Sequence, residues 1–255
     1  MVASFDLTGR NVLVTGGNGG IGLGMAEALA AAGANVAIWG RNEEKNAQAA
    51  AQLESYGGRV VAVRCDVSDE QEVERSTDET LDRLGHLHGC VANAGVGGMA
   101  SSYLEMSMDE WRRVLAVNLD GVFLTTRAAL RDMVDHGEGG SVVCVSSLAA
   151  IEGQPRGQHY AATKGALLSM TRAMAVEFAR YDIRANVILP GWVETDMTDG
   201  FLHLDAVQEK VLKRVPMRRW GQPPDFGGLA IYLMSDASAY HTGDTFVVDG
   251  GYAIF

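Results

Sequence analysis

The chain has 255 residues, of which 47% are hydrophobic, and its formal net charge is −11. This composition allows a large buried core, and the acidic balance argues against nucleic acid as a partner because phosphate binding needs a basic surface. No apolar run reaches the roughly 20 residues of a membrane-spanning helix, and Met1–Arg10 lacks the basic and apolar regions of a secretory signal. We therefore expect a cytoplasmic protein with no membrane partner.

Short apolar segments alternate with longer helical segments along the chain. The expected strands are residues 11–14, 35–39, 59–63, 87–92, 141–145, 183–189 and 245–248. The expected helices are residues 21–32, 43–55, 69–84, 108–135, 160–180 and 224–235, and the region 196–215 is also helical in pattern. Apolar strands that are each followed by a helix predict a parallel sheet covered on both faces. We therefore predict a single α/β domain, residues 1–255, with a doubly wound sheet.

Cysteine and histidine usage gives no sign of a metal site. Cys65, Cys90 and Cys144 are an odd number, and each lies beside an apolar or β-branched run. This placement is typical of buried strand residues rather than of a disulfide framework or a metal centre. The six histidines have no ligand-like spacing. His86 and His88 are expected on opposite sides of a strand.

A glycine-rich turn, Thr15–Gly22, separates the first predicted strand from the first helix. Gly16, Gly20 and Gly22 form the pattern G-x-x-x-G-x-G, which overlaps a G-x-G-x-x-G pattern that begins at Gly17. A turn without side chains lets the backbone approach a pyrophosphate, which then lies at the helix N-terminus. A glycine-rich loop can also be merely flexible, but its position between a strand and a helix favours binding of a dinucleotide.

The end of the second predicted strand bears on the choice between NAD and NADP. A carboxylate at this position binds the ribose 2′-hydroxyl and repels a 2′-phosphate. This chain has Trp39-Gly40-Arg41 there, with no acid before Glu43. Arg41 offers a guanidinium to a phosphate, although it could also simply begin an exposed helix. We therefore expect NADP(H) to be favoured over NAD(H) as the cofactor.

Tyr160 and Lys164 are four residues apart in a predicted helix, so they share one face of it. Such a pair is often only a solvated surface pair. However, a cation beside a phenol lowers its pKa from the usual value of about 10, which suits proton exchange between an alcohol and a carbonyl. Ser147, just before this helix, is placed to offer a hydroxyl to the same oxygen.

Seven short motifs occur in an order and spacing that resemble the short-chain dehydrogenase/reductase family over essentially the full chain. They are Thr15-Gly-x-x-x-Gly-x-Gly22, Cys65-Asp66-Val67, Asn93-Ala94-Gly95, Val117-Asn118, Ser146-Ser147, Tyr160-x-x-x-Lys164, and Pro190-Gly191 with Thr195. The resemblance implies a Rossmann-type fold and an oxidoreductase that interconverts a secondary alcohol and a ketone. It extends equally to 3-oxoacyl thioester reductases and to sugar or polyol dehydrogenases.

The resemblance implies four catalytic residues. Tyr160 is the expected general acid in reduction, and Ser147 is expected to polarise the carbonyl group. Lys164 is expected to hold the ribose hydroxyls of the nicotinamide nucleoside and to lower the pKa of Tyr160. Asn118 is expected to anchor a water molecule that links Lys164 to solvent, although an asparagine can also simply kink its helix.

The resemblance also implies a set of cofactor-binding residues. Asp66 is expected to accept a hydrogen bond from the adenine amino group, unless it is a turn residue. The Val193 backbone and the Thr195 hydroxyl are expected at the carboxamide, unless Thr195 is a helix cap. The complete expected set is Gly16, Asn18, Gly20, Ile21, Gly22, Arg41, Asp66, Val67, Asn93, Ala94, Gly95, Tyr160, Lys164, Pro190, Gly191, Val193 and Thr195.

Three variable segments are expected to enclose a small-molecule substrate: residues 96–104, 148–159 and 196–215. The third is expected to cover an apolar or amphipathic substrate, unless its apolar side chains belong to an ordinary helix core. Gln154 and Arg156 are the polar residues best placed to contact a substrate. His159 is expected to point away from Tyr160, because adjacent helix residues do not share a face.

The resemblance further implies a homotetramer. In this family the helices at 108–135 and 160–180 commonly form one dimer contact, and the last strand and tail form a second. Gly250–Phe255 ends on apolar residues that a monomer would expose. The alternative function is a non-catalytic nucleotide-sensing or scaffolding protein of the same fold. Such proteins usually lack the tyrosine or the lysine, and both are present here.

Overall fold

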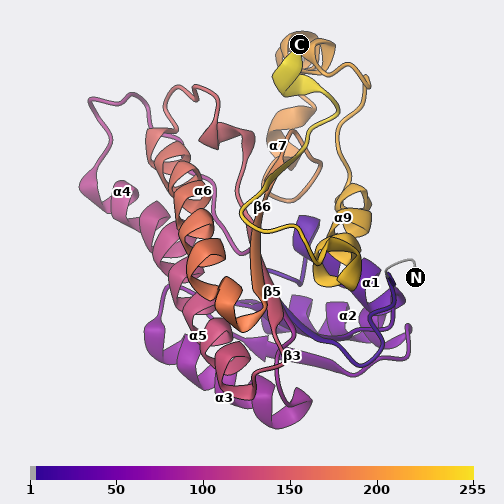
Figure 1. Cartoon of the computed structure of the whole chain (residues 1–255). Coiled ribbons are helices and arrows are strands. Elements are labelled where there is room, and N and C mark those ends of the chain that lie inside the picture. Colours follow the sequence, from indigo (N-terminus) through magenta and orange to yellow (C-terminus); the bar gives the residue numbers. More distant parts are fainter. Residues whose placement is uncertain (1–3) are drawn as a thin grey trace.

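The computed structural model describes residues 4–255, and a single seven-stranded sheet forms its centre (Figure 1). The strands are β1 (Asn11–Thr15), β2 (Asn35–Gly40), β3 (Val60–Arg64), β4 (Gly89–Ala92), β5 (Gly140–Val145), β6 (Ile183–Pro190) and β7 (Thr245–Val248). All neighbours pair in parallel in the order β3-β2-β1-β4-β5-β6-β7. The predicted doubly wound α/β sheet is confirmed. Residues 1–3, part of the stretch without a predicted signal, lie outside the described residues.

Helices cover both faces of the sheet, as Figure 1 shows. One face carries α3 (Glu70–Leu84), α5 (Gly121–His136) and α6 (Gln158–Phe178). The other carries α1 (Gly20–Ala31), α2 (Glu43–Glu54) and α9 (Gly227–Met234). Along β1, Val12 and Val14 pack in the core beneath α1 and α9, whereas Leu13 packs in the core beneath α5 and α6. Both faces are therefore apolar, which explains the absence of alternation in the strand sequences.

The predicted helix 108–135 is wrong at its middle. The chain forms α4 (Met108–Leu115), then a π-helical turn at Ala116–Asp120, and then α5. A π turn places one extra residue in the helix circumference. Asn118 in this turn bonds to a neighbouring loop, and Gly121 allows close contact with Val67, where an added Cβ would lie 2.7 Å from Cγ2. The regular α-helix is therefore interrupted where the chain makes these two contacts.

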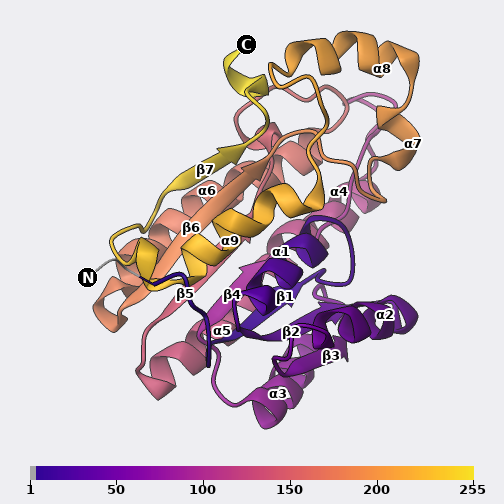
Figure 2. The ribbon, with the colours of Figure 1, turned by 90° about the vertical axis from the view of Figure 1, so that its right-hand side faces the viewer.

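The segment after β6 forms α7 (Asp199–Leu202), α8 (Asp205–Lys210) and a 3-10 turn at Leu212–Arg214, which confirms the predicted helical pattern of residues 196–215. Figure 2 shows α7 and α8 at the end of the molecule where β6 and β7 terminate. Leu202 is fully buried in a small core with Trp220 and Tyr252, whereas Met197 and Leu204 are exposed. In the described part of the chain, no helix combines the length and apolar character needed to cross a bilayer.

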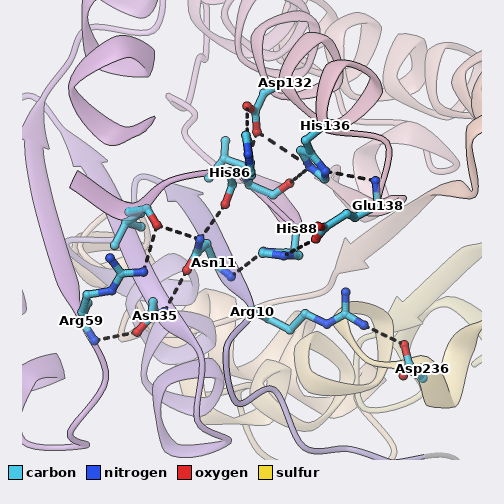
Figure 3. A network of polar contacts seen from close by, with 12 residues as sticks. Arg10, Asn11, Asn35, Arg59, His86, His88, Asp132, His136, Glu138 and Asp236 are labelled. Carbon is cyan, nitrogen blue, oxygen red and sulfur yellow. Dashed lines mark hydrogen bonds and ion pairs between the residues drawn. The ribbon is translucent and has the colours of Figure 1, made fainter. Parts of the chain in front are cut away.

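The opposite end of the sheet holds a polar network around three histidines (Figure 3). His88 Nδ1 accepts from the Asn11 N–H at 3.0 Å, and His136 Nε2 lies 3.0 Å from the carbonyl oxygen of Leu87. The rings of His86 and His88 both lie beside His136, with centroids 4.8 and 5.9 Å away. Their expected placement on opposite sides was therefore wrong, since alternate residues of an extended chain face the same way. Within residues 4–255, no histidine, cysteine or carboxylate group is arranged to hold a metal ion.

The three cysteines are buried, as predicted, and none is in a disulfide. Cys90 lies in β4, Cys144 lies in β5, and Cys65 directly follows β3. Burial raises the pKa of each thiol, to about 11 for Cys65 and Cys144. They are therefore unreactive core residues.

Candidate active site

The carboxyl ends of β1, β4, β5 and β6 surround a cleft of about 320 Å³, the location at which sheets of this type bind ligands. Its lining includes most of the predicted site residues: Gly16, Asn18, Gly20, Ile21, Asn93, Ala94, Gly95, Ser147, Tyr160, Lys164, Pro190, Gly191, Val193 and Thr195. A pocket of about 170 Å³ shares Gly16, Asn18, Ala94 and Gly95 with this cleft and adds Arg41, Asp66 and Val67. The two hollows therefore form one groove across the strand ends.

The glycine turn has the shape and the free donors to hold a pyrophosphate. Gly16 and Gly20 have φ values of +64° and +51°, which favour glycine. A Cβ added to Gly19 would meet nothing within 4 Å, so the space in front of α1 is open. The helix has no side-chain cap and no acid in its first turn. Its N-terminal N–H groups are therefore available to an anion.

The loop after β4 is attached to the turn by Thr15, whose side-chain role was missed from the sequence. Thr15 Oγ1 accepts hydrogen bonds from the N–H groups of Asn93 and Ala94, each at 3.1 Å. Asn93 Nδ2 donates to the Thr15 carbonyl oxygen at 2.9 Å. Gly22 does not line the cleft. It is a packing residue, because a Cβ there would lie 2.2 Å from the Gly16 carbonyl oxygen.

Tyr160 and Lys164 line the cleft from one face of α6. Lys164 Nζ lies 5.7 Å from the centroid of the Tyr160 ring and donates to the Val145 carbonyl oxygen at 2.9 Å. Burial lowers the pKa of Lys164 to about 8. Burial also raises the pKa of Tyr160, although a hydrogen bond with Ser147 opposes this change. The predicted lowering of the Tyr160 pKa by Lys164 is therefore wrong for this arrangement, in which the ammonium is bonded to a carbonyl and burial dominates.

Asn118 lies behind the cleft, where it is completely buried. Its Nδ2 donates to the Val96 carbonyl oxygen at 2.9 Å, and its Oδ1 accepts from the Val96 N–H at 2.8 Å. A Cβ on Gly95 would lie 3.3 Å from Asn118 Oδ1 and 3.5 Å from Lys164 Nζ. The backbone of Gly95 therefore lies between the two predicted relay residues.

The smaller pocket brings Arg41 and Asp66 together, with Arg41 Nη1 3.7 Å from Asp66 Oδ2. Asp66 Oδ1 accepts from the Ser68 N–H and hydroxyl at 3.0 and 2.6 Å, so Asp66 is also a turn residue. Burial favours the neutral acid, but these hydrogen bonds hold the pKa of Asp66 below its usual value. A Cβ on Gly40 would lie 2.2 Å from Asn18 Nδ2 and 2.6 Å from Asn46 Oδ1, so a side chain at this position would have to displace both amides.

Thr195 lies on the cleft wall that faces the start of α1. A Cβ on Gly20 would lie 3.2 Å from Thr195 Cγ2. The N-cap position of α7 belongs to Thr198, so Thr195 is not the cap of this helix. Thr198 Oγ1 accepts from the Thr195 N–H at 3.0 Å and donates to the Val193 carbonyl oxygen at 2.6 Å. This hydroxyl therefore holds both predicted contact residues in place.

One ion pair at the cleft was missed from the sequence, and two polar residues were placed wrongly. Lys45 and Asp196 form an ion pair of 2.5 Å at the cleft rim, which joins α2 to the segment after β6. No sequence pattern signals this contact, because 151 positions separate its members. Gln154 and Arg156, expected to meet the substrate, are not among the residues that line the cleft or the smaller pocket.

Comparison with known proteins identifies the family. The sequence pattern of the family described as enoyl-(acyl carrier protein) reductase matches residues 16–253. The chain is 37% identical to the 3-oxoacyl-[acyl-carrier-protein] reductase of Chlamydia pneumoniae, over 96% of this chain and 97% of that protein. It is also 37% identical to a short-chain type dehydrogenase/reductase from Mycobacterium marinum, whose crystal structure superposes with a TM-score of 0.92 over 97% of each chain. The chain belongs to the short-chain dehydrogenase/reductase family.

As a short-chain dehydrogenase/reductase, the protein is an oxidoreductase that acts on CH–OH and C=O groups with NAD(P). A third relative is a gluconate 5-dehydrogenase from Burkholderia cenocepacia, solved in complex with NADP and tartrate. Its structure has a TM-score of 0.94 and 37% identity, and the match covers 100% of this chain and 99% of that one. The tyrosine and lysine of the family pattern are both present and both line the cleft, which argues against the non-catalytic alternative.

Proposed function

We propose that this short-chain dehydrogenase/reductase interconverts a ketone and a secondary alcohol with NADP(H) as its preferred cofactor. The observation that carries the proposal is the placement of Ser147, Tyr160 and Lys164 in the same cleft as the open glycine turn. When bound, the nicotinamide supplies or accepts the hydride. During reduction Tyr160 donates a proton to the carbonyl oxygen, and Ser147 donates a hydrogen bond to that oxygen.

The remaining residues bind the cofactor and support proton transfer. The free N–H groups at the start of α1 hold the pyrophosphate, and Asp66 accepts from the adenine amino group. Lys164 holds the ribose hydroxyls of the nicotinamide nucleoside. Because its Nζ already bonds the Val145 carbonyl oxygen, it approaches those hydroxyls from a fixed position. Asn118 is assigned the anchoring of a water molecule that links Lys164 to solvent.

The NADP preference rests on the end of β2. Gly40 offers no carboxylate to the ribose 2′-hydroxyl, and Arg41 lines the smaller pocket together with Asp66. The gluconate 5-dehydrogenase of Burkholderia cenocepacia, which binds NADP, supports this assignment. Glu43 and Glu44 line an open hollow together with Arg41, so the guanidinium must offset their charges when it binds a 2′-phosphate.

Two substrate classes fit the proposal, a 3-oxoacyl thioester and a sugar or polyol. The Chlamydia pneumoniae relative supports the first, and the Burkholderia cenocepacia relative supports the second. We further propose a cytoplasmic homotetramer. Phe123 on α5 and Val176 on α6 are exposed, and so are Ile254 and Phe255 at the C-terminus, which leaves apolar side chains available in both regions proposed for contacts between subunits.

A matrix of cofactors and substrates tests the proposal. Purified enzyme is assayed with NADPH and NADH on acetoacetyl coenzyme A, ethyl acetoacetate and sorbose, and with NADP⁺ and NAD⁺ on gluconate. The absorbance of the reduced nicotinamide reports turnover. We expect turnover on one substrate class, with a higher kcat/KM for the phosphorylated cofactor. A higher value for NADH would refute the NADP preference, and cofactor binding without turnover on an extended carbonyl panel would favour the non-catalytic alternative.

A further inference from the structure

His159 directly precedes Tyr160 on α6, and its side chain is completely buried on another side of the helix. Its Nε2 lies 3.2 Å from Glu110 Oε1, while its Nδ1 has no hydrogen-bond partner. The expectation that His159 points away from Tyr160 is confirmed, because Tyr160 lines the cleft and His159 does not. A buried ring nitrogen without a partner costs stability. An aliphatic side chain would avoid that cost if core packing were the only role of this position.

Glu110 connects the buried ring to Arg113 on the same helix, α4. Arg113 Nε and Nη2 donate to the two carboxylate oxygens at 2.7 and 2.9 Å. The same Nη2 donates to the carbonyl oxygen of Gly97 at 2.9 Å. The hydrogen bonds from Arg113 hold the pKa of Glu110 at about 2, so the carboxylate stays charged at any working pH. His159, Glu110, Arg113 and the Gly97 carbonyl form one continuous chain of contacts, which we call the His159 network.

The loop after β4 passes between this network and the cleft. A Cβ added to Gly98 would lie 2.3 Å from His159 Nε2 and 2.8 Å from Val114 Cγ2, so the backbone of Gly98 rests against the ring. A Cβ added to Gly97 would lie 3.7 Å from Met197 Cγ, and Met197 lines the cleft. Two consecutive glycines therefore allow the backbone to fit between the buried histidine and Met197 of the cleft lining.

We propose that the His159 network holds the Gly97–Gly98 backbone beside Met197 of the cleft lining, which makes His159 a positioning residue for the carbonyl substrate. Helix α6 thus carries the proposed proton donor on one side and the support of this loop on another. The cofactor side of the cleft has separate support, because Thr15 holds Asn93 and Ala94. Loss of the network should therefore affect substrate binding and leave cofactor binding unchanged. This inference depends on the family's carbonyl chemistry and not on which substrate class is correct.

The first test compares His159→Leu, which removes the hydrogen bond, with His159→Gln, whose amide offers a donor near the position of Nε2. Ethyl acetoacetate is varied at saturating NADPH, or the best substrate of the panel replaces it. We expect KM to rise about tenfold in His159→Leu and to stay near the wild-type value in His159→Gln. We expect kcat to change by less than about threefold and the Kd for NADPH to be unchanged. A variant that merely folds poorly loses kcat in proportion to its active fraction and keeps its KM.

The second test measures backbone hydrogen exchange in residues 97–104 by mass spectrometry without substrate. Arg113→Ala alters a half-exposed side chain, so it remains informative if His159→Leu does not fold. Gly98→Ala should displace the loop directly. Gly228→Ala is the matched control, because a Cβ there meets nothing within 4 Å. We expect faster exchange in residues 97–104 of Arg113→Ala and Gly98→Ala, and no change in Gly228→Ala. An unchanged KM in the folded variants, or a weaker Kd for NADPH, would overturn the proposal.

Discussion

Lys164 Nζ donates a hydrogen bond to the carbonyl oxygen of Val145 at 2.9 Å, from a side chain that is almost completely buried. Ser146 Oγ donates to the Lys164 carbonyl oxygen at 2.7 Å, so α6 is attached to the end of β5 by two hydrogen bonds. A buried ammonium with a single carbonyl partner is costly, because it loses most of its hydration. The cleft therefore retains a group that destabilises the fold, which is consistent with the proposed role of Lys164 in cofactor binding.

Replacement of this lysine should stabilise the fold. Lys164→Met keeps the apolar stem and removes the buried charge, so we expect the free energy of unfolding at pH 7 to rise by about 2 kcal/mol. The folded pKa of about 8 lies below the unfolded value of about 10.4, so the wild type gains stability as pH rises from 8 to 10. Denaturant unfolding at pH 8 and pH 10 should show that the difference in unfolding free energy between Lys164→Met and the wild type is smaller at pH 10. A less stable variant at pH 7 would contradict this assignment.

Removal of the Tyr160 hydroxyl should abolish chemistry and spare binding. Tyr160→Phe keeps the ring that lines the cleft and loses the proton donor. We expect turnover to fall by at least about a thousandfold, with the Kd for NADPH within about twofold of the wild type. Steady-state kinetics measure the turnover, and fluorescence titration measures the Kd for NADPH. Appreciable turnover in this variant would remove Tyr160 from its proposed role.

Arg41 should distinguish the two cofactors. Arg41→Ala removes the guanidinium near the end of β2, so NADPH should lose about tenfold or more in affinity while NADH changes little. Arg59→Ala is a suitable control, since Arg59 donates to the carbonyl oxygens of Arg83 and Leu84, away from the cleft lining. Equal losses for the two cofactors in Arg41→Ala would refute the phosphate contact.

Gly19 and Gly22 provide a matched pair within one turn. A Cβ on Gly22 would lie 2.2 Å from the Gly16 carbonyl oxygen, whereas a Cβ on Gly19 meets nothing. We expect Gly22→Ala to lower the free energy of unfolding by about 3 kcal/mol and Gly19→Ala to change it by less than about 0.5 kcal/mol. Chemical denaturation of both variants measures these values. Similar stabilities would mean that the turn relaxes around the added methyl group.

His88 should make stability depend on pH. Burial, followed by the charge of Arg10, lowers the pKa of His88 in the folded state. The unfolded chain therefore binds this proton more readily than the folded protein. The stability that the neutral His88 contributes is fully present above about pH 6.5, and it is lost as pH falls through the folded pKa. His88→Asn keeps an acceptor for the Asn11 N–H, so its unfolding free energy should fall less than that of the wild type between pH 7 and pH 5. Parallel losses in the two proteins would assign the effect to other groups.

Much of the fold and of the site was predictable, because the decisive signals are local. Val12, Leu13 and Val14 are consecutive apolar residues, and such a run already indicates a strand covered on both faces. The spacing of Tyr160 and Lys164 places both side chains on one helix face before any packing is known. The π turn around Asn118 was not predictable in this way. Its partner, Val96, belongs to another segment, and only packing brings the two together.

The sequence by itself determined the parallel sheet and the glycine turn, since each depends on periodicity or spacing over a few residues. Most of the residues that meet at the strand ends were implied by the resemblance of its motifs to a known family. Only the tertiary structure decided where Lys164 directs its ammonium, why His86 and His88 both lie against His136, and that His159 supports Gly98. Those contacts join residues far apart in the chain. Their distances are set by how whole helices pack on the sheet, and a short sequence pattern carries no information about that packing.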